Sequence, residues 1–405
     1  MSELAPTPVT LLLECGAYYS CQGWGDFSAP RGSEIVFCTA MTGIEESLTD
    51  PSFAGQLLVN TVAHVGNTGV NHDDMESEKI WAEGLVCRYL DQTPSSWRTK
   101  ESLKDWIVDQ GRYVLEGLDT REITTILRER GSMRALVYSN AAMTVDEARQ
   151  YLRERVDPMA GRELVSLVTC SEIYEFTEEV GGKDLVGSDS TGEALPYWPM
   201  NSKPNRVQGS CTIGVWDFGV KKNTLRILKS CGAKVKVLPA QMKADEIRSQ
   251  GLDGLLLSNG PGDPAAAEYI YKELRDLIGE LPIFAICLGH QLVAHALGAK
   301  TYKMKFGHRG IHHPVLELSE GGEARRTWIT SQNHGFAVDP RSLPEDVFVS
   351  FQHADDASVE GLTVKGKDCQ TVQFHPEAGP GPYDSMGLIE KFVERVARGA
   401  KSNDA

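Results

Sequence analysis

Long apolar runs, paired cysteines and the pattern of a secretory signal peptide are all missing from the sequence. No stretch approaches the length of a transmembrane helix, and residues 1–6 lack the basic start and apolar core of a secretory signal peptide. The nine cysteines have no regular spacing and form no CxxC pair, a usage that is typical of reduced thiols. We therefore expect a cytoplasmic protein without structural disulfides.

Signatures for phosphate, metal and nucleic-acid binding are missing as well. The chain contains no GxxxxGK(S/T) sequence and no convincing GxGxxG after a predicted strand, so we expect it to bind no nucleotide cofactor. Several histidines lie between His308 and His313, but their spacing matches no zinc pattern, and we predict no metal site. The net charge of −15 argues against nucleic acid as a partner.

The length of 405 residues exceeds what one hydrophobic core usually serves, so we expect two domains. Residues 181–209 are rich in Gly, Ser, Asp and Pro, a composition that is typical of a linker. We therefore predict an N-terminal mixed α/β domain over residues 1–180 and a second domain over residues 210–400. In the first domain, periodicity predicts strands at 9–14, 34–38 and 56–62 and helices at 120–130 and 145–155.

The second half alternates between short apolar strands and helices. Strands are predicted at 212–217, 234–238 and 254–257, with helices at 221–230 and 244–250 between them. This alternation predicts an α/β fold with a doubly wound, mostly parallel sheet. Ligands bind such sheets at the carboxyl ends of the strands, so residues that directly follow a strand are the candidates for function.

One of these positions holds a cysteine, in the turn Ala285-Ile286-Cys287-Leu288-Gly289. A predicted strand at 282–286 precedes it, and a predicted helix at 290–298 follows it. A cysteine at a helix N-terminus lies at the positive end of the macrodipole, which favours thiolate over thiol. Because free cysteine is usually a small core residue, this turn alone does not assign a chemistry.

Another predicted strand, 369–374, is followed by His375-Pro376-Glu377. A thiol, an imidazole and a carboxylate are the nucleophile, general base and orienting acid of a covalent hydrolase. Cys287, His375 and Glu377 are therefore the candidate catalytic residues. Amide hydrolysis by this set also needs donors to the tetrahedral oxyanion, and it needs no metal.

Together with the loop from Ser258 to Pro264, these motifs resemble a class I glutamine amidotransferase. The N-terminal half, in turn, is similar to the family of carbamoyl phosphate synthetase small, glutamine-hydrolysing subunits. The resemblance runs roughly from Val9 to Val396. It is carried in the N-terminal half by residues 41–52 (MTGIEESLTDPS), by Gly66-Asn67 with Gly69-Val70-Asn71, and by Asp119-Thr120-Arg121.

The resemblance implies that Cys287 attacks the side-chain carbonyl of glutamine and forms a γ-glutamyl thioester. His375 would move the proton and Glu377 would orient the imidazole. Pro261 has no N–H, so a glycine amide of that loop and the amide of Leu288 would hold the oxyanion. Ser52 lies in the other predicted domain, which would make the site interdomain. The residues implied to bind glutamine are Ser52, Gly260, Gly262, Leu288, Gln291, Asn333, Gly335 and Phe336.

A division of labour is also implied. A large partner subunit would receive the ammonia through an internal tunnel and make carbamoyl phosphate from ATP and bicarbonate. ATP and Mg would bind to that partner, and this chain would bind glutamine without a cofactor of its own. The product would serve arginine synthesis, pyrimidine synthesis or both, and the sequence leaves these open.

Four positions depart from the family pattern. Ala285 stands where glycine usually precedes the nucleophile by two residues, Ile44 replaces a tyrosine, residues 62–65 replace a Tyr-Pro segment, and His312 replaces an asparagine. The added methyl group of Ala285 predicts a slightly strained turn that survives. None of the changes removes a catalytic group.

Two other functions are compatible with parts of the chain. One is a subunit that supplies ammonia to a different synthetase, against which the signature at residues 41–52 argues. The other is a non-catalytic scaffold, which would have no need to keep Cys287, His375 and Glu377 together.

Overall fold

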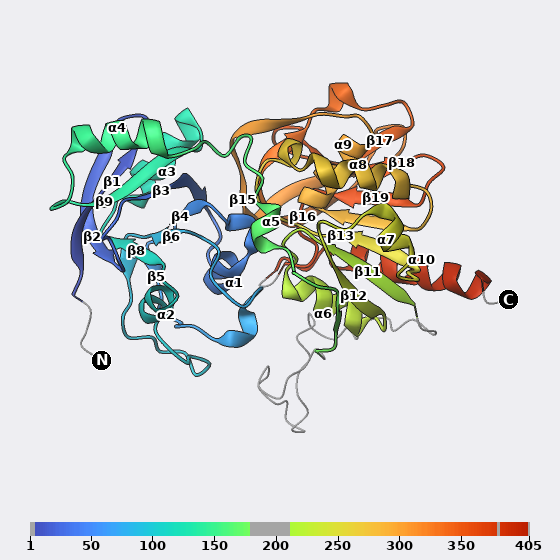
Figure 1. Ribbon diagram of the computed structural model, residues 1–405, viewed down its shortest axis with the longest axis horizontal. Helices are drawn as coiled ribbons and strands as arrows, with labels where there is room; N and C mark the ends of the chain where they lie inside the picture. Colours follow the sequence, from blue (N-terminus) through green and yellow to red (C-terminus); the bar gives the residue numbers. More distant parts are fainter. Residues whose placement is uncertain (1–4, 179–210, 379–380, 404–405) are drawn as a thin grey trace. The chain divides into compact units, whose positions relative to one another are not determined.

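The computed structural model describes residues 5–178, 211–378 and 381–403 (Figure 1). The chain divides into two units. Unit 1 comprises Met1–Arg162 and Lys303–Gly310, and unit 2 comprises Glu163–Tyr302 and Ile311–Ala405. The predicted linker at 181–209 lies outside the described residues.

Unit 1 is built on a closed barrel of seven strands in the order β1-β2-β8-β6-β4-β3-β9. Strands β3, β4, β6 and β8 pair in parallel, whereas β1 pairs antiparallel with both β2 and β9. Val9, Leu11 and Leu13 belong to the main core cluster, while Leu12 packs in a second cluster with Leu152, as the two-residue period of a strand requires. The strands are β1 (Thr7–Leu13), β2 (Tyr18–Trp24), β3 (Arg31–Cys38), β4 (Gln56–Asn60), β6 (Gly84–Val86), β8 (Tyr113–Glu116) and β9 (Met133–Ser139).

The remaining elements of unit 1 surround this barrel. Helices α3 (Thr120–Arg130) and α4 (Val145–Arg155) have the bounds that the sequence predicts, because Asp119 and Thr144 cap their first turns. The others are α1 (Ile44–Thr49), α2 (Leu103–Asp109), the 3-10 helices η1 (Pro51–Phe53) and η2 (His72–Asp74), and a separate pair of strands, β5 (His64–Val65) and β7 (Tyr89–Leu90).

Unit 2 contains a ten-stranded sheet in the order β10-β12-β11-β13-β14-β19-β18-β17-β15-β16. Its centre, from β12 to β19, is parallel, which confirms the predicted doubly wound sheet. Antiparallel strands extend it at both edges, an extension that the sequence pattern did not indicate. The strands are β10 (Tyr174–Phe176), β11 (Thr212–Asp217), β12 (Lys234–Pro239), β13 (Gly254–Leu257), β14 (Ile283–Ile286), β15 (Thr301–Leu318), β16 (Ala324–Val338), β17 (Val347–His353), β18 (Val359–Val364) and β19 (Cys369–Val372).

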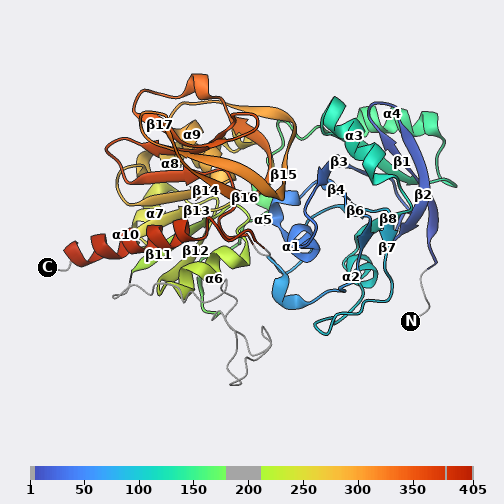
Figure 2. The ribbon, with the colours of Figure 1, turned by 180° about the vertical axis from the view of Figure 1, so that it is seen from behind.

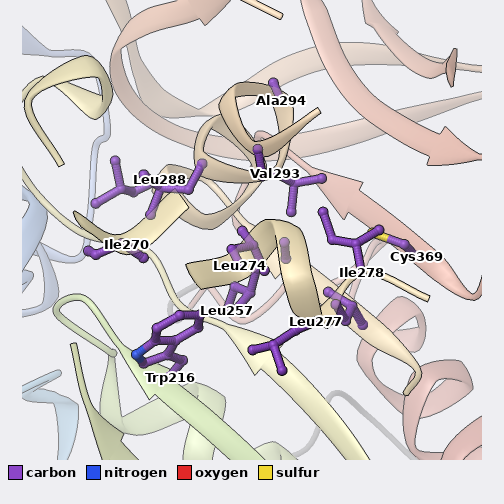
Figure 3. Packing of buried hydrophobic residues seen from close by; sticks show 14 of the residues in the cluster. Trp216, Leu257, Ile270, Leu274, Leu277, Ile278, Leu288, Val293, Ala294 and Cys369 are labelled. Atoms are coloured by element: carbon purple, nitrogen blue, oxygen red, sulfur yellow. The ribbon is translucent and has the colours of Figure 1, made fainter. Parts of the chain in front are cut away.

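Helices cover both faces of the parallel part of this sheet (Figures 1 and 2). Leu255 and Leu257 pack on the side of α7, α8 and α9, whereas Leu256 packs on the side of α6 and α10. Figure 3 shows Leu257 among the residues of α8 and α9. This alternation buries every residue of β13, as a two-sided parallel strand requires. The helices are α5 (Val165–Val168), α6 (Lys222–Ser230), α7 (Ala244–Arg248), α8 (Glu268–Leu277), α9 (Leu288–Ala296) and α10 (Gly387–Asn403), with 3-10 helices η3 (Pro264–Ala266) and η4 (Pro340–Ser342).

The first unit ends earlier than the predicted boundary at residue 180. Residues 163–180 belong to unit 2: β10 adds to the sheet beside β12, and the backbone amide of Cys170 donates to Asp217 Oδ2 at 2.7 Å. The strand β10 has only three residues, of which Phe176 alone is buried, so its pairing leaves little trace in the sequence.

No helix in the described part of the chain is long and apolar enough to cross a membrane. All nine cysteines are free thiols.

Candidate active site

Cys287 lies at a strained turn between β14 and α9. Its backbone has φ 52° and ψ −103°, and Ala357 is the one other described non-glycine residue with positive φ. Such a conformation costs of order 1–3 kcal/mol, and the surrounding structure must hold it. Here the Cys287 amide donates to the Val372 carbonyl at 2.8 Å, and the Gln291 amide donates to the Cys287 carbonyl at 3.2 Å.

Gly289 allows this turn to pack closely against β13. A Cβ atom at this position would lie 2.6 Å from the carbonyl oxygen of Leu257, closer than real Cβ atoms come. The Gly289 amide donates to the Ser258 carbonyl at 3.1 Å. The glycine thus brings the start of α9 against the segment that follows β13.

Ala285, the position at which we expected slight strain, is accommodated within the sheet. It is fully buried in the core cluster on the side of α9, and it pairs with Leu257 of β13. Positive φ occurs two residues later, at the nucleophile itself. The extra methyl group therefore fills core volume and leaves the turn intact.

His375 and Glu377 follow β19, the neighbour of β14. His375 Nδ1 lies 2.6 Å from Glu377 Oε1, and neither side chain is exposed to solvent. Since a carboxylate oxygen accepts, Nδ1 donates and carries a proton. The His375 amide donates to the Ser331 carbonyl at 3.0 Å, which ties this loop to β16.

The charges of these groups are coupled. Burial and the Lys221 ammonium lower the pKa of His375. The Glu377 carboxylate and the Cys287 side chain raise it by more, so the pKa lies above its ordinary value, at about 10. Burial raises the pKa of Glu377, but Lys221 and His375 lower it to about 2. His375 is therefore a cation at neutral pH between a carboxylate and the cysteine. Its Nε2 atom has no partner at ordinary hydrogen-bond distance among the described residues. Catalytic hydrogen bonds are often long before substrate binds and shorten in the complex.

Lys221 is a member of this site that the sequence analysis missed. Its Nζ atom lies 3.0 Å from Glu377 Oε1, and its side chain is 8% exposed. Asn223 Nδ2 donates to the backbone carbonyl of Glu377. Lys221 comes shortly after the carboxyl end of β11, so the strand-end rule that singled out Cys287 would also have found it.

The loop after β13 lies next to the start of α9. A Cβ atom on Gly260 would lie 2.2 Å from the Phe218 carbonyl oxygen and 2.8 Å from Leu288 Cδ2, so only glycine fits. Gly262 has φ 93° and forms an isolated bridge with Glu163. Leu288 is the first residue of α9, and its amide has no acceptor within the helix. The predicted oxyanion donors thus come from adjoining segments.

The structure brings four more predicted site residues to this end of unit 2. Cys287 Sγ lies 3.7 Å from the Asn333 carbonyl oxygen. Gln291 Nε2 donates to the Phe336 carbonyl at 2.8 Å, and Gly335 lies between Asn333 and Phe336 on β16. These contacts join α9 to β16 beside the nucleophile.

Ser52 belongs to unit 1, where it lies buried on η1. Its amide donates to Asp50 Oδ1 at 2.9 Å. Its participation in glutamine binding, and with it the interdomain site, stays a prediction.

The histidine-rich segment also divides between the units. His308 groups with unit 1, whereas His312 and His313 belong to unit 2. His313 Nδ1 lies 3.1 Å from His353 Nε2, so one imidazole donates to the other. The expectation that the chain binds no metal stays a prediction.

Comparisons with known proteins agree with both halves of this arrangement. The family model for glutamine amidotransferase class-I matches residues 214–395, and the model for the carbamoyl-phosphate synthase small chain, CPSase domain, matches residues 11–137. The carbamoyl phosphate synthase small chain of Haemophilus ducreyi is 41% identical over 401 residues, covering 96% of this chain and 98% of the relative. This chain belongs to the carbamoyl phosphate synthase small chain family.

Other members of the family show similar agreement. The small chain of Pseudomonas aeruginosa is 40% identical over 96% of this chain and 98% of its own length. The chloroplastic small chain of Oryza sativa is 40% identical over 95% of this chain and 81% of its own length. Among solved structures, a putative GMP synthase subunit from Thermoplasma acidophilum covers 49% of this chain and 99% of its own, with 24% identity and a TM-score of 0.42.

Replacing Glu377 by glutamine tests the charge coupling at the site. The carboxylate raises the pKa of His375, so its removal lowers that pKa, and the imidazolium will lose its proton at a lower pH than in the wild type. We expect the ¹⁵N resonances of His375, assigned by comparison with His375→Asn, to titrate at lower pH in Glu377→Gln.

A matched control is Glu317→Gln. This carboxylate accepts a hydrogen bond from Trp328 Nε1 at 3.0 Å, and we expect its removal to leave the His375 titration unchanged. An identical titration in Glu377→Gln and the wild type would contradict the coupling.

Proposed function

We propose that this chain is the glutaminase subunit of a carbamoyl phosphate synthetase. The observation that carries the proposal is the buried Cys287, His375 and Glu377 set in a class I amidotransferase domain, preceded by the domain of the small chain family. The chain would hydrolyse glutamine to glutamate and ammonia. The ammonia would pass through a channel to a large subunit, which makes carbamoyl phosphate from ATP and bicarbonate.

The reaction begins with the sulfur of Cys287 as the nucleophile, its proton already passed to His375, which is then an imidazolium; the raised pKa of His375, about 10, supports its cationic state. Sulfur attacks the side-chain carbonyl of glutamine, and the carbonyl π electrons move onto oxygen. Amides from Leu288 and from Gly260 or Gly262 would receive that oxyanion. His375 then gives its proton to the leaving nitrogen, ammonia departs, and the γ-glutamyl thioester forms.

Hydrolysis of the thioester reverses these roles. Neutral His375 takes a proton from water, the hydroxide oxygen attacks the thioester carbonyl, and glutamate leaves as the C–S bond breaks. Glu377 stabilises the imidazolium through its 2.6 Å contact with Nδ1. Lys221, 3.0 Å from the same carboxylate oxygen, keeps Glu377 ionised in a site where burial alone would favour its protonated form.

We propose that glutamine is held by Gln291, Asn333, Gly335, Phe336 and, from unit 1, Ser52. The chain would use no cofactor, and ATP and Mg would bind to the large subunit, with which it would form a heterodimer in arginine or pyrimidine biosynthesis. We keep the expectation of a cytoplasmic location, which the nine free thiols support.

Coupling to the partner is tested by measuring glutamate release from glutamine with and without the large subunit, ATP and bicarbonate. We expect turnover of the complete system to stimulate hydrolysis and to yield carbamoyl phosphate. Hydrolysis that is indifferent to this partner would instead favour delivery of ammonia to another synthetase. No hydrolysis under any condition would contradict the enzymatic proposal.

Cys287→Ser separates the two half-reactions in the complex. Because the weaker serine nucleophile cannot sustain thioester chemistry, we expect glutamine-dependent synthesis to fall by about 10³-fold or more. Synthesis from free ammonia should persist, since it needs only the large subunit. Cys15→Ser makes the same chemical change in unit 1 and should preserve both activities. Loss of both activities in Cys287→Ser would contradict the division of labour.

A further inference from the structure

Strand β16 carries the predicted glutamine-binding residues, and two further side chains alternate with them. The proposed chemistry does not use these two side chains. Gln332 and His334 flank Asn333, and both are buried. Successive side chains of a strand point to opposite faces. Gln332 and His334 therefore share the face opposite to that of Asn333 and Gly335, and whatever holds them sets the orientation of the binding residues.

Both side chains meet the carboxylate of Glu360, on β18. Gln332 Nε2 donates to Glu360 Oε2 at 2.7 Å, and His334 Nε2 lies 3.7 Å from Oε1. The Ser358 hydroxyl donates to Oε1 at 3.4 Å. Glu360 is fully buried, and a carboxylate in such a place must be compensated by donors and opposite charge. One carboxylate thus organises two alternate residues of the strand.

The other nitrogen of His334 extends this arrangement to the backbone. Nδ1 lies 2.8 Å from the Phe336 carbonyl oxygen, and since a carbonyl only accepts, Nδ1 carries the proton. The same carbonyl accepts from Gln291 Nε2 at 2.8 Å. His334 and Gln291 therefore fix the peptide group of a predicted glutamine-binding residue from two directions.

A second route joins Glu360 to Gln291. The backbone amide of Gln373 donates to the backbone carbonyl of Glu360 at 2.8 Å, and Gln291 Nε2 donates to the side-chain oxygen Oε1 of Gln373 at 2.9 Å. Gln373 is fully buried and lies two residues before His375. The carboxylate and backbone of Glu360 thus connect β16, α9 and the segment that leads to His375.

We propose that Glu360 is a positioning residue for glutamine. It holds Gln332 and His334 so that Asn333, Gly335 and Phe336 present their binding groups in register with Gln291. The inference rests on the proposed function. None of the contacts of Glu360 that carry it involves Cys287, His375 or Glu377, so its loss should weaken glutamine binding and leave the chemical step nearly intact.

The test compares Glu360→Ala with Glu360→Gln in the complex with the large subunit. A hydrogen bond to a buried charge is lost in the alanine variant, so we expect KM for glutamine to rise roughly tenfold, with kcat within about twofold of the wild type. Glutamine at position 360 can still accept the hydrogen bond from Gln332 through its side-chain carbonyl oxygen. This variant should therefore restore most of the wild-type KM.

Glu317→Gln, on β15, is the matched control and should keep the wild-type KM. If Glu360→Ala does not fold, Gln332→Ala removes the same hydrogen bond from the other side and should raise KM in the same way. A wild-type KM in whichever alanine variant folds would overturn the proposal, as would a fall in kcat with KM unchanged, or a Glu360→Gln variant as impaired as Glu360→Ala.

Calorimetric titration with glutamine in the Cys287→Ser background separates this inference from the function on which it rests. Weaker binding after Glu360→Ala supports the positioning role, and equal binding with and without that change refutes it. If Cys287→Ser with Glu360 intact binds no glutamine at all, the proposed function itself fails.

Discussion

The backbone conformation of Cys287 is the constraint from which the site follows. A residue with φ 52° fits neither a strand nor a helix, so β14 ends and α9 begins at Cys287, and the sulfur lies at the turn between them. Two backbone hydrogen bonds hold this conformation: the Cys287 amide donates to the Val372 carbonyl, and the Gly289 amide donates to the Ser258 carbonyl. The same two contacts bring β19 and the loop after β13 to the nucleophile.

Burial then determines the electrostatics. A carboxylate and an imidazole out of contact with solvent would each prefer the neutral state, and both keep their charge only because each faces an opposite charge. Lys221, Glu377 and His375 alternate in charge and lie next to Cys287, and the four residues come from segments that follow β11, β19 and β14. Parallel strands end at one edge of the sheet, so the topology places these segments together.

Much of this could be predicted from the sequence because the signals are local. Helices α3 and α4 carry their own caps, β11 and β13 are short apolar runs, and the catalytic residues lie in compact motifs directly after strands. The missed features depend on contacts distant in sequence. Glu360 looks like an ordinary strand residue until folding buries it beside Gln332 of another strand. Lys221 follows a strand, but its role depends on the contact with the distant residue Glu377. Closure of the barrel in unit 1 and pairing of β10 with β12 are non-local in the same sense.

The central claim is that the sulfur of Cys287 becomes covalently bound to the glutamyl group of glutamine. The most direct measurement is to quench the enzyme in acid during turnover with isotope-labelled glutamine and to map the label by peptide mass spectrometry. We expect a hydroxylamine-sensitive glutamyl adduct on the peptide that contains Cys287, absent from Cys287→Ser. Steady hydrolysis with no labelled peptide under quench conditions that preserve a thioester standard, or a label on another residue, would contradict it.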